Sequence, residues 1–258
     1  MVDIREPSPQ TMLDIKKTDP LKRKEAVTSL ADTPTVAAIQ ALIDRLRDSD
    51  AEVREAASDT LTRIGTPKIV ARLSQAPRDS VTWAGVARTL AKIGTTESVQ
   101  VLAEALQDRS SDVWSTASLA LADVGPAAGE ALAAALNHDV ASVRARAAMA
   151  LGRARVTAAM DALVAATRDA DPSVRMEAVV ALAALRENRA VPALLEALND
   201  AEEAVRQSVP IALGEIGTEA AIEGLKQAAQ HEDEGIRWVA EWQLQEMTEE
   251  QEPSFEIS

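Results

Sequence analysis

The feature that most constrains this chain is a column of residues that returns at a nearly constant interval along its whole length. Successive members lie 29 to 31 residues apart, and a leucine follows each of them seven positions later. A period of this size, held along a whole chain, is typical of stacked helical repeats in which each unit contacts only its neighbours. We number positions within a repeat relative to this column. Its members are Arg23, Arg54, Trp83, Trp114, Arg144, Arg175, Arg206 and Arg237, and the leucines at +7 are Leu30, Leu61, Leu90, Leu121, Leu151, Leu182, Leu213 and Leu244.

One stretch, residues 171–200, shows how the repeat is built: DPSVRMEAVVALAALRENRAVPALLEALND. Asp171 and Pro172 predict an N-cap and the first residue of a helix. Apolar residues at −1, +3, +6, +7 and +10 then share one helix face, and a second helix with its own apolar stripe follows a break at 186–188. We call the helix that carries the column residue the column helix. In other repeats a glycine ends it, which predicts a left-handed C-cap at Gly65, Gly94, Gly125 and Gly217.

This pattern predicts an all-α chain of about eight two-helix repeats without strands. We expect one solenoid over residues 1–247, followed by an acidic, disordered tail at 248–258. The first repeat has only a short first helix, the third is shortened between Pro67 and Pro77, and Pro210 predicts a kink in its column helix. The units run over residues 8–33, 34–65, 66–94, 95–125, 126–155, 156–186, 187–217 and 218–247, and the column helix is the second of each unit.

The consensus DPSVRxEAxxALxxL…AVPALLEAL resembles the HEAT-like repeat of the phycobilin lyase family, over nearly the whole chain. The resemblance implies a right-handed α-α superhelix, with the column helices on the concave face and the first helices on the convex face. Such repeats occur in scaffolds, adaptors, chaperone-like lyases and a few enzymes, so function must be argued from the surfaces.

Acidic residues near the column predict a ladder of ion pairs between neighbouring repeats. An arginine in the first turn of a helix needs a carboxylate partner, because it faces the positive end of the helix dipole. Position −4 is acidic in six repeats and is Ser110 or Val140 in the fourth and fifth. We therefore expect the ladder to break there, beside Trp83 and Trp114. The six acidic residues are Asp19, Asp50, Asp79, Asp171, Glu202 and Asp233.

Composition argues against several classes of function. The net charge of −14 disfavours nucleic acid and anionic membranes as partners, and no apolar run is long enough to span a membrane. The chain has no cysteine and its start lacks the apolar stretch of a signal peptide, so we expect a cytoplasmic protein.

No cofactor, metal or catalytic residue is expected either. The two histidines, His138 and His231, lie three repeats apart, too far to share a metal, and their position predicts polar groups at helix ends. Deoxyhypusine hydroxylases resemble the chain but bind iron through several His-Glu dipeptides, of which only His231-Glu232 is present here. A lyase-type activity is the one enzymatic alternative left open.

Positions on the column helices that point away from the core carry the clearest functional signal. Position +5 is polar in the first three repeats (Thr28, Asp59, Arg88) and apolar in the later five, while +1 adds Met176 and Trp238. Position +8 is small over the same range (Ala122, Gly152, Ala183, Gly214), which predicts an apolar trough with a low floor. The alternatives are that +5 belongs to the core between repeats, or that it forms the seam of a homodimer.

The leading hypothesis is a non-enzymatic scaffold or adaptor that binds an amphipathic helix or a peptide of a protein partner, with the acidic rim favouring a basic one. An alternative is a chaperone that resembles phycobilin lyases and holds a linear tetrapyrrole between the trough and Trp83 and Trp114. For these two tryptophans, packing at the ladder break is favoured over a ligand site. Trp238 and Trp242 have a competing role in capping the last repeat or holding the tail. The candidate partner-binding residues are Leu119, Met149, Met176, Val180, Ile211, Trp238, Trp242, Trp83 and Trp114.

Overall fold

The computed structural model describes residues 6–249 of the 258-residue chain, and this range contains helices and no strand. The chain divides into two compact units, Met1–Ala127 and Ala128–Ser258, and we describe each by itself. Each unit contains four of the expected repeats, so the all-α, two-helix repeat architecture is confirmed. The expected tail begins inside the last helix, which extends to Glu249, and its remainder lies outside the described residues.

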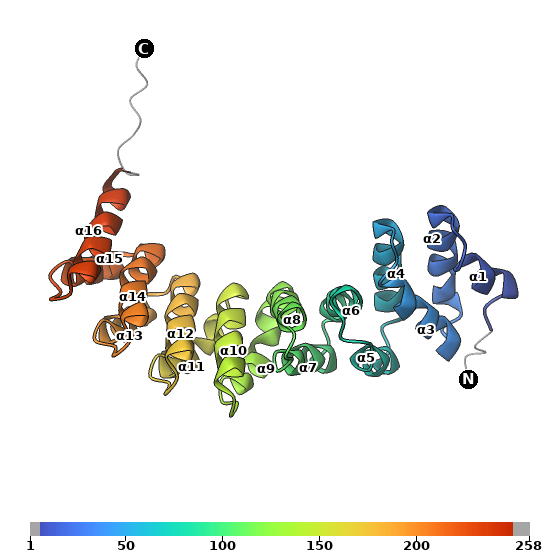
Figure 1. Cartoon of the computed structure of the whole chain (residues 1–258), viewed down its shortest axis with the longest axis horizontal. Helices are drawn as coiled ribbons and strands as arrows, with labels where there is room; N and C mark the ends of the chain where they lie inside the picture. The colour runs from blue at the N-terminus through green and yellow to red at the C-terminus, as the bar shows by residue number, and fades with distance from the viewer. Residues whose placement is uncertain (1–5, 250–258) are drawn as a thin grey trace, which may run out of the picture. The chain divides into compact units, whose positions relative to one another are not determined.

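Unit 1 consists of four helix pairs, in which the even-numbered helices are the column helices (Figure 1). The first helix α1 spans only six residues and the fifth, α5, only eight, as the degraded first repeat and the two prolines of the third predict. The elements are α1 (Pro9–Asp14), α2 (Pro20–Ser29), η1 (Leu30–Asp32), α3 (Val36–Arg45), α4 (Ala51–Ile64), α5 (Pro67–Ser74), α6 (Ser80–Ile93), α7 (Thr96–Ala105) and α8 (Ser111–Val124).

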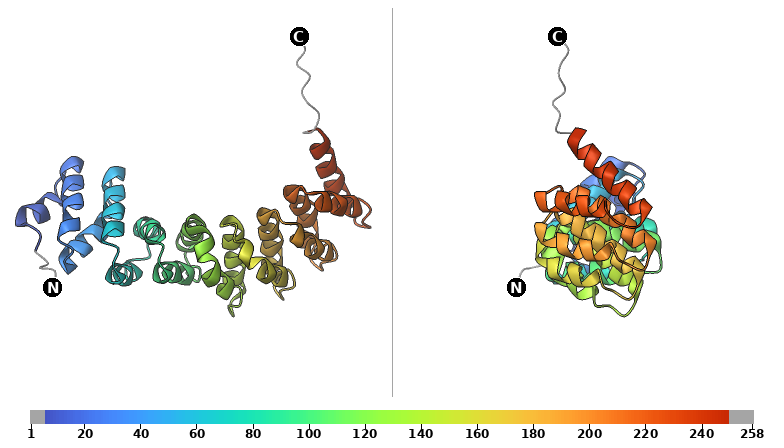
Figure 2. Two further views of the ribbon diagram at one scale, coloured as in Figure 1. Left: turned by 180° about the vertical axis from the view of Figure 1, so that it is seen from behind. Right: turned by 90° about the vertical axis from the view of Figure 1, so that its left-hand side faces the viewer.

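Unit 2 repeats this arrangement after a 3-10 turn, η2 (Gly125–Ala128). Its column helices α10, α12, α14 and α16 pack against one another in sequence and form one row, which Figure 2 shows from behind. The elements are α9 (Gly129–Ala135), α10 (Ala141–Arg153), η3 (Thr157–Ala159), α11 (Met160–Ala166), α12 (Pro172–Leu185), η4 (Asn188–Ala190), α13 (Val191–Ala197), α14 (Glu203–Ile216), α15 (Glu219–Ala228) and α16 (Glu234–Glu249).

The column helices bury the expected face and one position more. On α12 the residues at −1, +3, +6, +7 and +10 are all buried, as predicted. Position +4 is buried as well on every column helix except α16, although the sequence pattern did not assign it to the core. In unit 1 the hydroxyl of Thr89 at +6 donates to that of Ser58 at +4 of the preceding repeat, at 3.0 Å. Position +4 therefore faces the next column helix along the chain.

The glycine caps are confirmed at three of four positions. Gly65, Gly94 and Gly217 end their helices in the left-handed conformation, whereas Gly125 has a positive φ of 70° with ψ −140°, outside that region. In the 156–186 repeat, the residue that ends the column helix is Arg186 and not glycine, and its backbone adopts the same left-handed conformation, with φ 55°. Pro210 lies inside α14, which is assigned as one continuous helix from Glu203 to Ile216.

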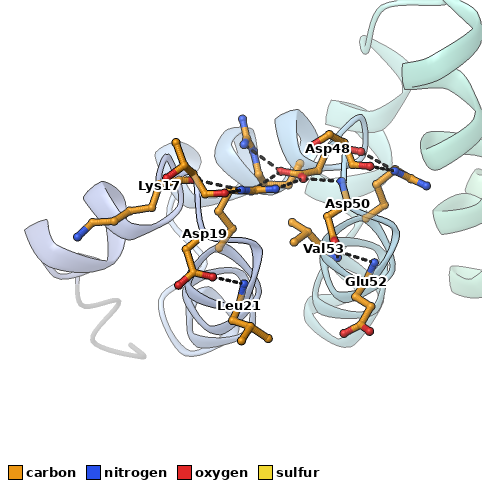
Figure 3. A network of polar contacts seen from close by, with 12 residues as sticks. Lys17, Asp19, Leu21, Asp48, Asp50, Glu52 and Val53 are labelled. Carbon is orange, nitrogen blue, oxygen red and sulfur yellow. Dashed lines mark hydrogen bonds and ion pairs between the residues drawn. The ribbon is translucent and has the colours of Figure 1, made fainter.

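Five of the six acidic residues at −4 cap their own helices, and of these Asp233 is also a ladder partner of the expected kind, because it pairs with Arg206. The Asp171 carboxylate accepts the backbone N–H of Ser173 at 2.9 Å, and Asp79 accepts that of Thr82 at 2.9 Å. Figure 3 shows the same capping at Asp19 and Asp50, which open α2 and α4. These carboxylates satisfy N–H groups that have no partner within the helix, which is the usual role of an N-cap aspartate.

Other pairs of the ladder are formed by aspartates at −6 of the following repeat. In unit 2, Arg144 donates from Nη2 and Nε to the two carboxylate oxygens of Asp169 at 2.7 and 2.8 Å, and Arg175 binds Asp200 in the same way. In unit 1, Arg23 and Asp48 make the equivalent bidentate pair, and Figure 3 shows Asp48 at this junction. The prediction of an inter-repeat ion-pair ladder is thus confirmed in kind, but it was wrong about the acidic partner of Arg23, Arg144 and Arg175 and right about that of Arg206, which is Asp233 at −4.

Each column arginine also binds the turn that leads into its own helix. Nη1 of Arg144 donates to the carbonyl oxygens of His138 and Asp139, in the turn between α9 and α10, at 2.8 and 3.2 Å. The equivalent bonds recur at Arg23, Arg54, Arg175, Arg206 and Arg237. One guanidinium therefore joins a column helix, the turn that precedes it and, where the aspartate is present, the next repeat.

Both histidines occupy the −6 position of this ladder. His138 Nδ1 accepts the backbone N–H of Val140 at 3.0 Å, and His231 Nδ1 accepts that of Asp233 at 3.1 Å. The aspartates at −6 accept the corresponding N–H in other repeats, as Asp169 does from Asp171. Each histidine thus accepts the same turn hydrogen bond as the aspartate does, but it lacks the negative charge that would pair with a column arginine. Arg206, which is followed by His231 at −6, pairs with Asp233 at −4 instead, at 3.5 Å.

We predict that Asp169→Asn lowers the free energy of unfolding at pH 7 by about 2 kcal/mol, since a charge-assisted bidentate pair is lost while the turn acceptor is kept. The hydrogen bonds from Arg144 hold the pKa of Asp169 below its usual range. A depressed pKa stabilises the fold above the unfolded value, about 3.9, and this contribution disappears as the pH falls through the folded pKa. Urea unfolding should therefore show a constant difference from the parent above about pH 5 that closes below about pH 4.

The matched control for this substitution is Asp161→Asn. Asp161 pairs with Arg189 on an exposed part of the same unit, so its loss should change stability by less than about 0.5 kcal/mol at every pH. Equal effects of the two substitutions would show that the ladder has no special role in stability.

Candidate partner-binding surface

The column helices of unit 2 expose a row of apolar side chains at +5 and +1. Val180 on α12 is 49% exposed, Ile211 on α14 is 44% exposed, and Trp242 on α16 is 47% exposed. Their exposure shows that they are not core residues between repeats, which was one of the alternatives. Met149 on α10 and Met176 on α12 are half-buried at the edges of the same face, and Trp238 is the most exposed member. We call these residues the apolar row: Met149, Met176, Val180, Ile211, Trp238 and Trp242.

Leu119 holds the equivalent +5 position in unit 1. It lies on α8 and is 55% exposed, so its side chain is accessible as the sequence predicted. Because it belongs to the other unit, we treat it as a separate apolar site and not as a contact of the apolar row.

Two of the four small residues at +8 do not form the floor of a trough. Gly152 and Ala183 are buried, and a Cβ atom built on Gly152 would lie 2.7 Å from the Cα of Ala181 on the next column helix. Position +8 therefore permits the close approach of α10 and α12, and this part of the prediction was wrong. The periodicity of one helix could not show it, because whether +8 faces solvent depends on where the next helix lies.

The same face of unit 1 is occupied by ion pairs. Glu55 at +1 is bound by Lys92 and by Arg88 at +5 of the next repeat, and Lys92 also reaches Asp59 at 2.8 Å. The hydrogen bond from Lys92 is the main cause that lowers the pKa of Glu55. A cavity of about 380 Å³ between α2 and α4 is lined largely by such charged groups. The charged side chains of unit 1 therefore neutralise each other on this face, whereas the apolar row has no such pairing.

Trp83 does not belong to any surface. Its side chain is fully buried, and its Nε1 donates to the carbonyl oxygen of Val113 at 3.1 Å. Arg78 lies 5.1 Å from the ring centroid and pairs with Asp108 at 3.3 Å, so it supplies the cation that the column lacks at this position. The inclusion of Trp83 among partner-binding residues is thus contradicted, and its role is packing, which was the favoured interpretation. Trp114 is half-buried on α8.

Negative charge is concentrated in the part of the chain that carries the apolar row. Residues 128–258 contain 23 acidic and 11 basic residues, whereas residues 1–127 contain 18 and 16. Twelve of the fourteen net negative charges therefore lie in unit 2. An apolar surface inside an acidic field favours partners that carry positive charge.

The titratable side chains of the described residues bear on whether a metal site or a proton-transfer group is present. No group of three or more His, Asp or Glu side chains within residues 6–249 is placed to hold a metal ion. Both histidines act as turn acceptors, as shown above. Glu177 at +2 of α12 is half-buried, and desolvation raises its pKa while nearby Arg153 opposes the shift. No described helix is long and apolar enough to cross a membrane.

The close approach at +8 can be tested directly. Gly152→Val should lower the free energy of unfolding by about 1–3 kcal/mol, because the added side chain would overlap the backbone of α12. The control is Ala165→Val on α11, which is exposed and should change stability by less than about 0.5 kcal/mol. If Gly152→Val left thermal unfolding unchanged, position +8 would be open to solvent as first expected.

Comparisons with known proteins agree with this architecture. A model of HEAT repeats matches residues 10–84, 69–151, 129–209 and 161–245. No curated protein matches the sequence. A structure of Kap95p, solved with RanGDP, is similar with a TM-score of 0.51 at 15% identity, covering 98% of this chain and 43% of that one.

Two further structures are similar over most of both chains. Human deoxyhypusine hydroxylase, solved with glycerol, is 23% identical with a TM-score of 0.42, covering 93% of this chain and 94% of that one. The CpcE–CpcF complex of phycocyanin lyase from Nostoc sp. PCC7120 is 21% identical with a TM-score of 0.34, covering 94% and 96%. At these identities the likeness concerns the fold alone.

The family matches extend from residue 10 to residue 245 and follow the helix pairs of both units. The chain therefore belongs to the family of HEAT-repeat proteins.

Proposed function

We propose that this chain is a non-enzymatic interaction module that binds a helix or an extended peptide of a protein partner on the apolar row. The observation that carries this proposal is the exposure of Val180, Ile211 and Trp242 at one repeat position, where unit 1 has paired charges. Exposed apolar patches on repeat proteins commonly mark partner sites. Leu119 offers a further apolar contact in unit 1, and Trp114, half-buried on the same helix, remains a candidate.

The spacing of the apolar row favours a helical partner. Packed helices lie about 8–10 Å apart, and a helix advances about 10.5 Å in seven residues. A helix lying across α10, α12, α14 and α16 would therefore present one apolar residue to each column helix at heptad spacing. Three such intervals correspond to a segment of about 20 residues.

The negative charge of unit 2 favours a basic partner. The apolar row lies in the unit that holds most of the net negative charge, which would attract Lys and Arg beside the apolar residues of a partner.

The lack of cysteine supports a reducing, cytoplasmic compartment. We also infer one continuous solenoid over residues 1–247, since the repeat interval passes from Trp114 to Arg144 without an insertion. The tetrapyrrole alternative is not proposed, because Trp83 is buried and cannot form a wall of its site.

The proposal predicts that Val180→Asp with Ile211→Asp abolishes partner capture without unfolding the protein, since both side chains are exposed. Affinity capture from native extract, with circular dichroism and thermal unfolding as folding checks, measures this. The matched control is Val140→Asp, an exposed valine of the same unit at the start of α10, where aspartate is a favourable N-cap. Capture that survives the double substitution, or is lost equally in the control, would falsify the proposal.

A further inference from the structure

The two most prominent exposed aromatic side chains of the described residues lie on one face of the last helix. Trp238 is 66% exposed and Trp242 is 47% exposed on α16. Residues four positions apart on a helix are neighbours on its surface, with Cβ atoms about 5–6 Å apart. The two indoles therefore form one aromatic face, one helical turn long.

Their exposure has a structural cause in the repeat. In earlier repeats position +4 is covered by the next column helix, as Ser58 is by Thr89. On α16 the residue at +4 is Glu241, and it is exposed, because α16 is the last column helix of the described residues. Terminal repeats usually carry polar residues on such an open face. Glu241 and Gln245 fit this rule, but two tryptophans do not, so they need another explanation.

The aromatic face is surrounded by negative charge. Glu234, Glu241 and Glu246 are exposed on the same helix. The single basic residue on α16 is Arg237, whose Nη1 binds the carbonyl oxygens of His231 and Glu232 at 2.7 and 2.8 Å. The other basic residue of this repeat, Lys226, pairs with Glu223. The local field therefore favours a cation supplied by a partner.

The chain already contains this kind of recognition in a buried form. In unit 1, Arg78 lies over the ring of Trp83 and pairs with the carboxylate of Asp108. A guanidinium is well suited to this double contact, since it stacks on an aromatic face while its N–H groups donate to a carboxylate. On α16 the tryptophans and the carboxylates are present, and the guanidinium is the missing component.

We propose that the Trp238–Trp242 face of α16 binds arginine side chains, and lysine side chains more weakly, of the protein partner. The cationic group stacks on the indoles and pairs with Glu241, while Glu234 and Glu246 contribute to the negative field around it. The inference rests on the proposed function for the presence of a protein partner, and it assigns the partner's charged residues to one helix. Val180 and Ile211 would contact the apolar residues of the same segment.

The test uses the full chain and three fluorescent 21-residue amphipathic peptides, whose leucines at heptad positions are identical. Their polar positions are Arg, Lys or Gln, and binding is measured by anisotropy at about 20 and 300 mM salt. We expect the parent protein to bind the Arg peptide most tightly and the Gln peptide most weakly. Trp238→Ala with Trp242→Ala should weaken all three peptides, because it removes apolar contacts of α16, but it should weaken the Arg peptide about tenfold more than the Gln peptide, because only the Arg peptide also loses the cation–π contact. Phe at both positions should restore part of the affinity.

Two further variants separate charge and apolar contacts. Changing Glu234, Glu241 and Glu246 to Gln should remove most of the salt dependence for the Arg peptide, whereas the same change at Glu130, Glu187 and Glu219, exposed elsewhere in unit 2, should preserve it. Val180→Ser with Ile211→Ser should weaken all three peptides equally, because it removes apolar contacts alone.

The outcomes distinguish the two proposals. If the Ser variant binds all peptides like the parent while the tryptophan variant loses the Arg peptide, the proposed function fails and the cation site stands. Equal loss of the Arg and Gln peptides in the tryptophan variant, or no loss, would overturn the cation site. It would also be overturned if the Arg peptide bound only to a chain that ends at Glu249, since residues 250–258 would then be the occupant.

Discussion

The junction made by one guanidinium is the interaction on which the regular repeats depend. A column arginine such as Arg144 binds the carbonyl groups of the turn before its own helix and the aspartate of the next repeat. Because each carboxylate also accepts a backbone N–H of the following turn, the end of one repeat and the start of the next are fixed together. The pair is largely shielded from water and bidentate, so it constrains geometry more strongly than a surface ion pair does. Repeats that lack a component use a substitute: Arg78 beside Trp83, or Asp233 in place of His231.

Much of this fold follows from local chemistry and was therefore predictable. The column period, the core positions, the short α1 and α5 and three glycine caps all depend on residues close in sequence, and the structure confirms them. The ladder was harder, because both −4 and −6 are often acidic and the choice depends on where the next repeat places its backbone. Asp171 is close enough to cap its own helix, so the more distant Asp169 pairs with Arg144. The distinguishing signal was present: position −6 is aspartate after Arg23, Arg144 and Arg175, whereas it is proline after Arg54 and histidine after Arg206, which do not make this pair.

The surface was only partly predictable for the same reason. Exposure of Val180 and Ile211 follows from the helical wheel, since +5 lies opposite the core stripe. Burial at +4 and +8 does not, because those residues are covered by the next column helix and not by their own repeat. Trp83 was wrongly placed among the partner-binding residues, because a tryptophan in a column of arginines was taken as a sign that the ladder ends there. Its indole instead fills the space and donates the hydrogen bond that joins α6 to α8, with Arg78 supplying the charge.

These contacts restrict where a repeat of this kind can vary to gain a function. The +4, +6 and +8 positions are committed to packing between column helices, and −6 and −4 are committed to the junction and the cap. Positions +1 and +5 remain, and they can change without disturbing the stack because they face solvent. In the second and third repeats they carry Glu55, Asp59 and Arg88, whose charges are engaged in ion pairs, which leaves little reason to bind a partner. In unit 2 they carry methionine, valine, isoleucine and tryptophan, whose exposure costs free energy that binding of an apolar segment would recover. At α16 the open +4 position adds a carboxylate between two indoles, so the end of the stack can recognise charge as well as apolar surface.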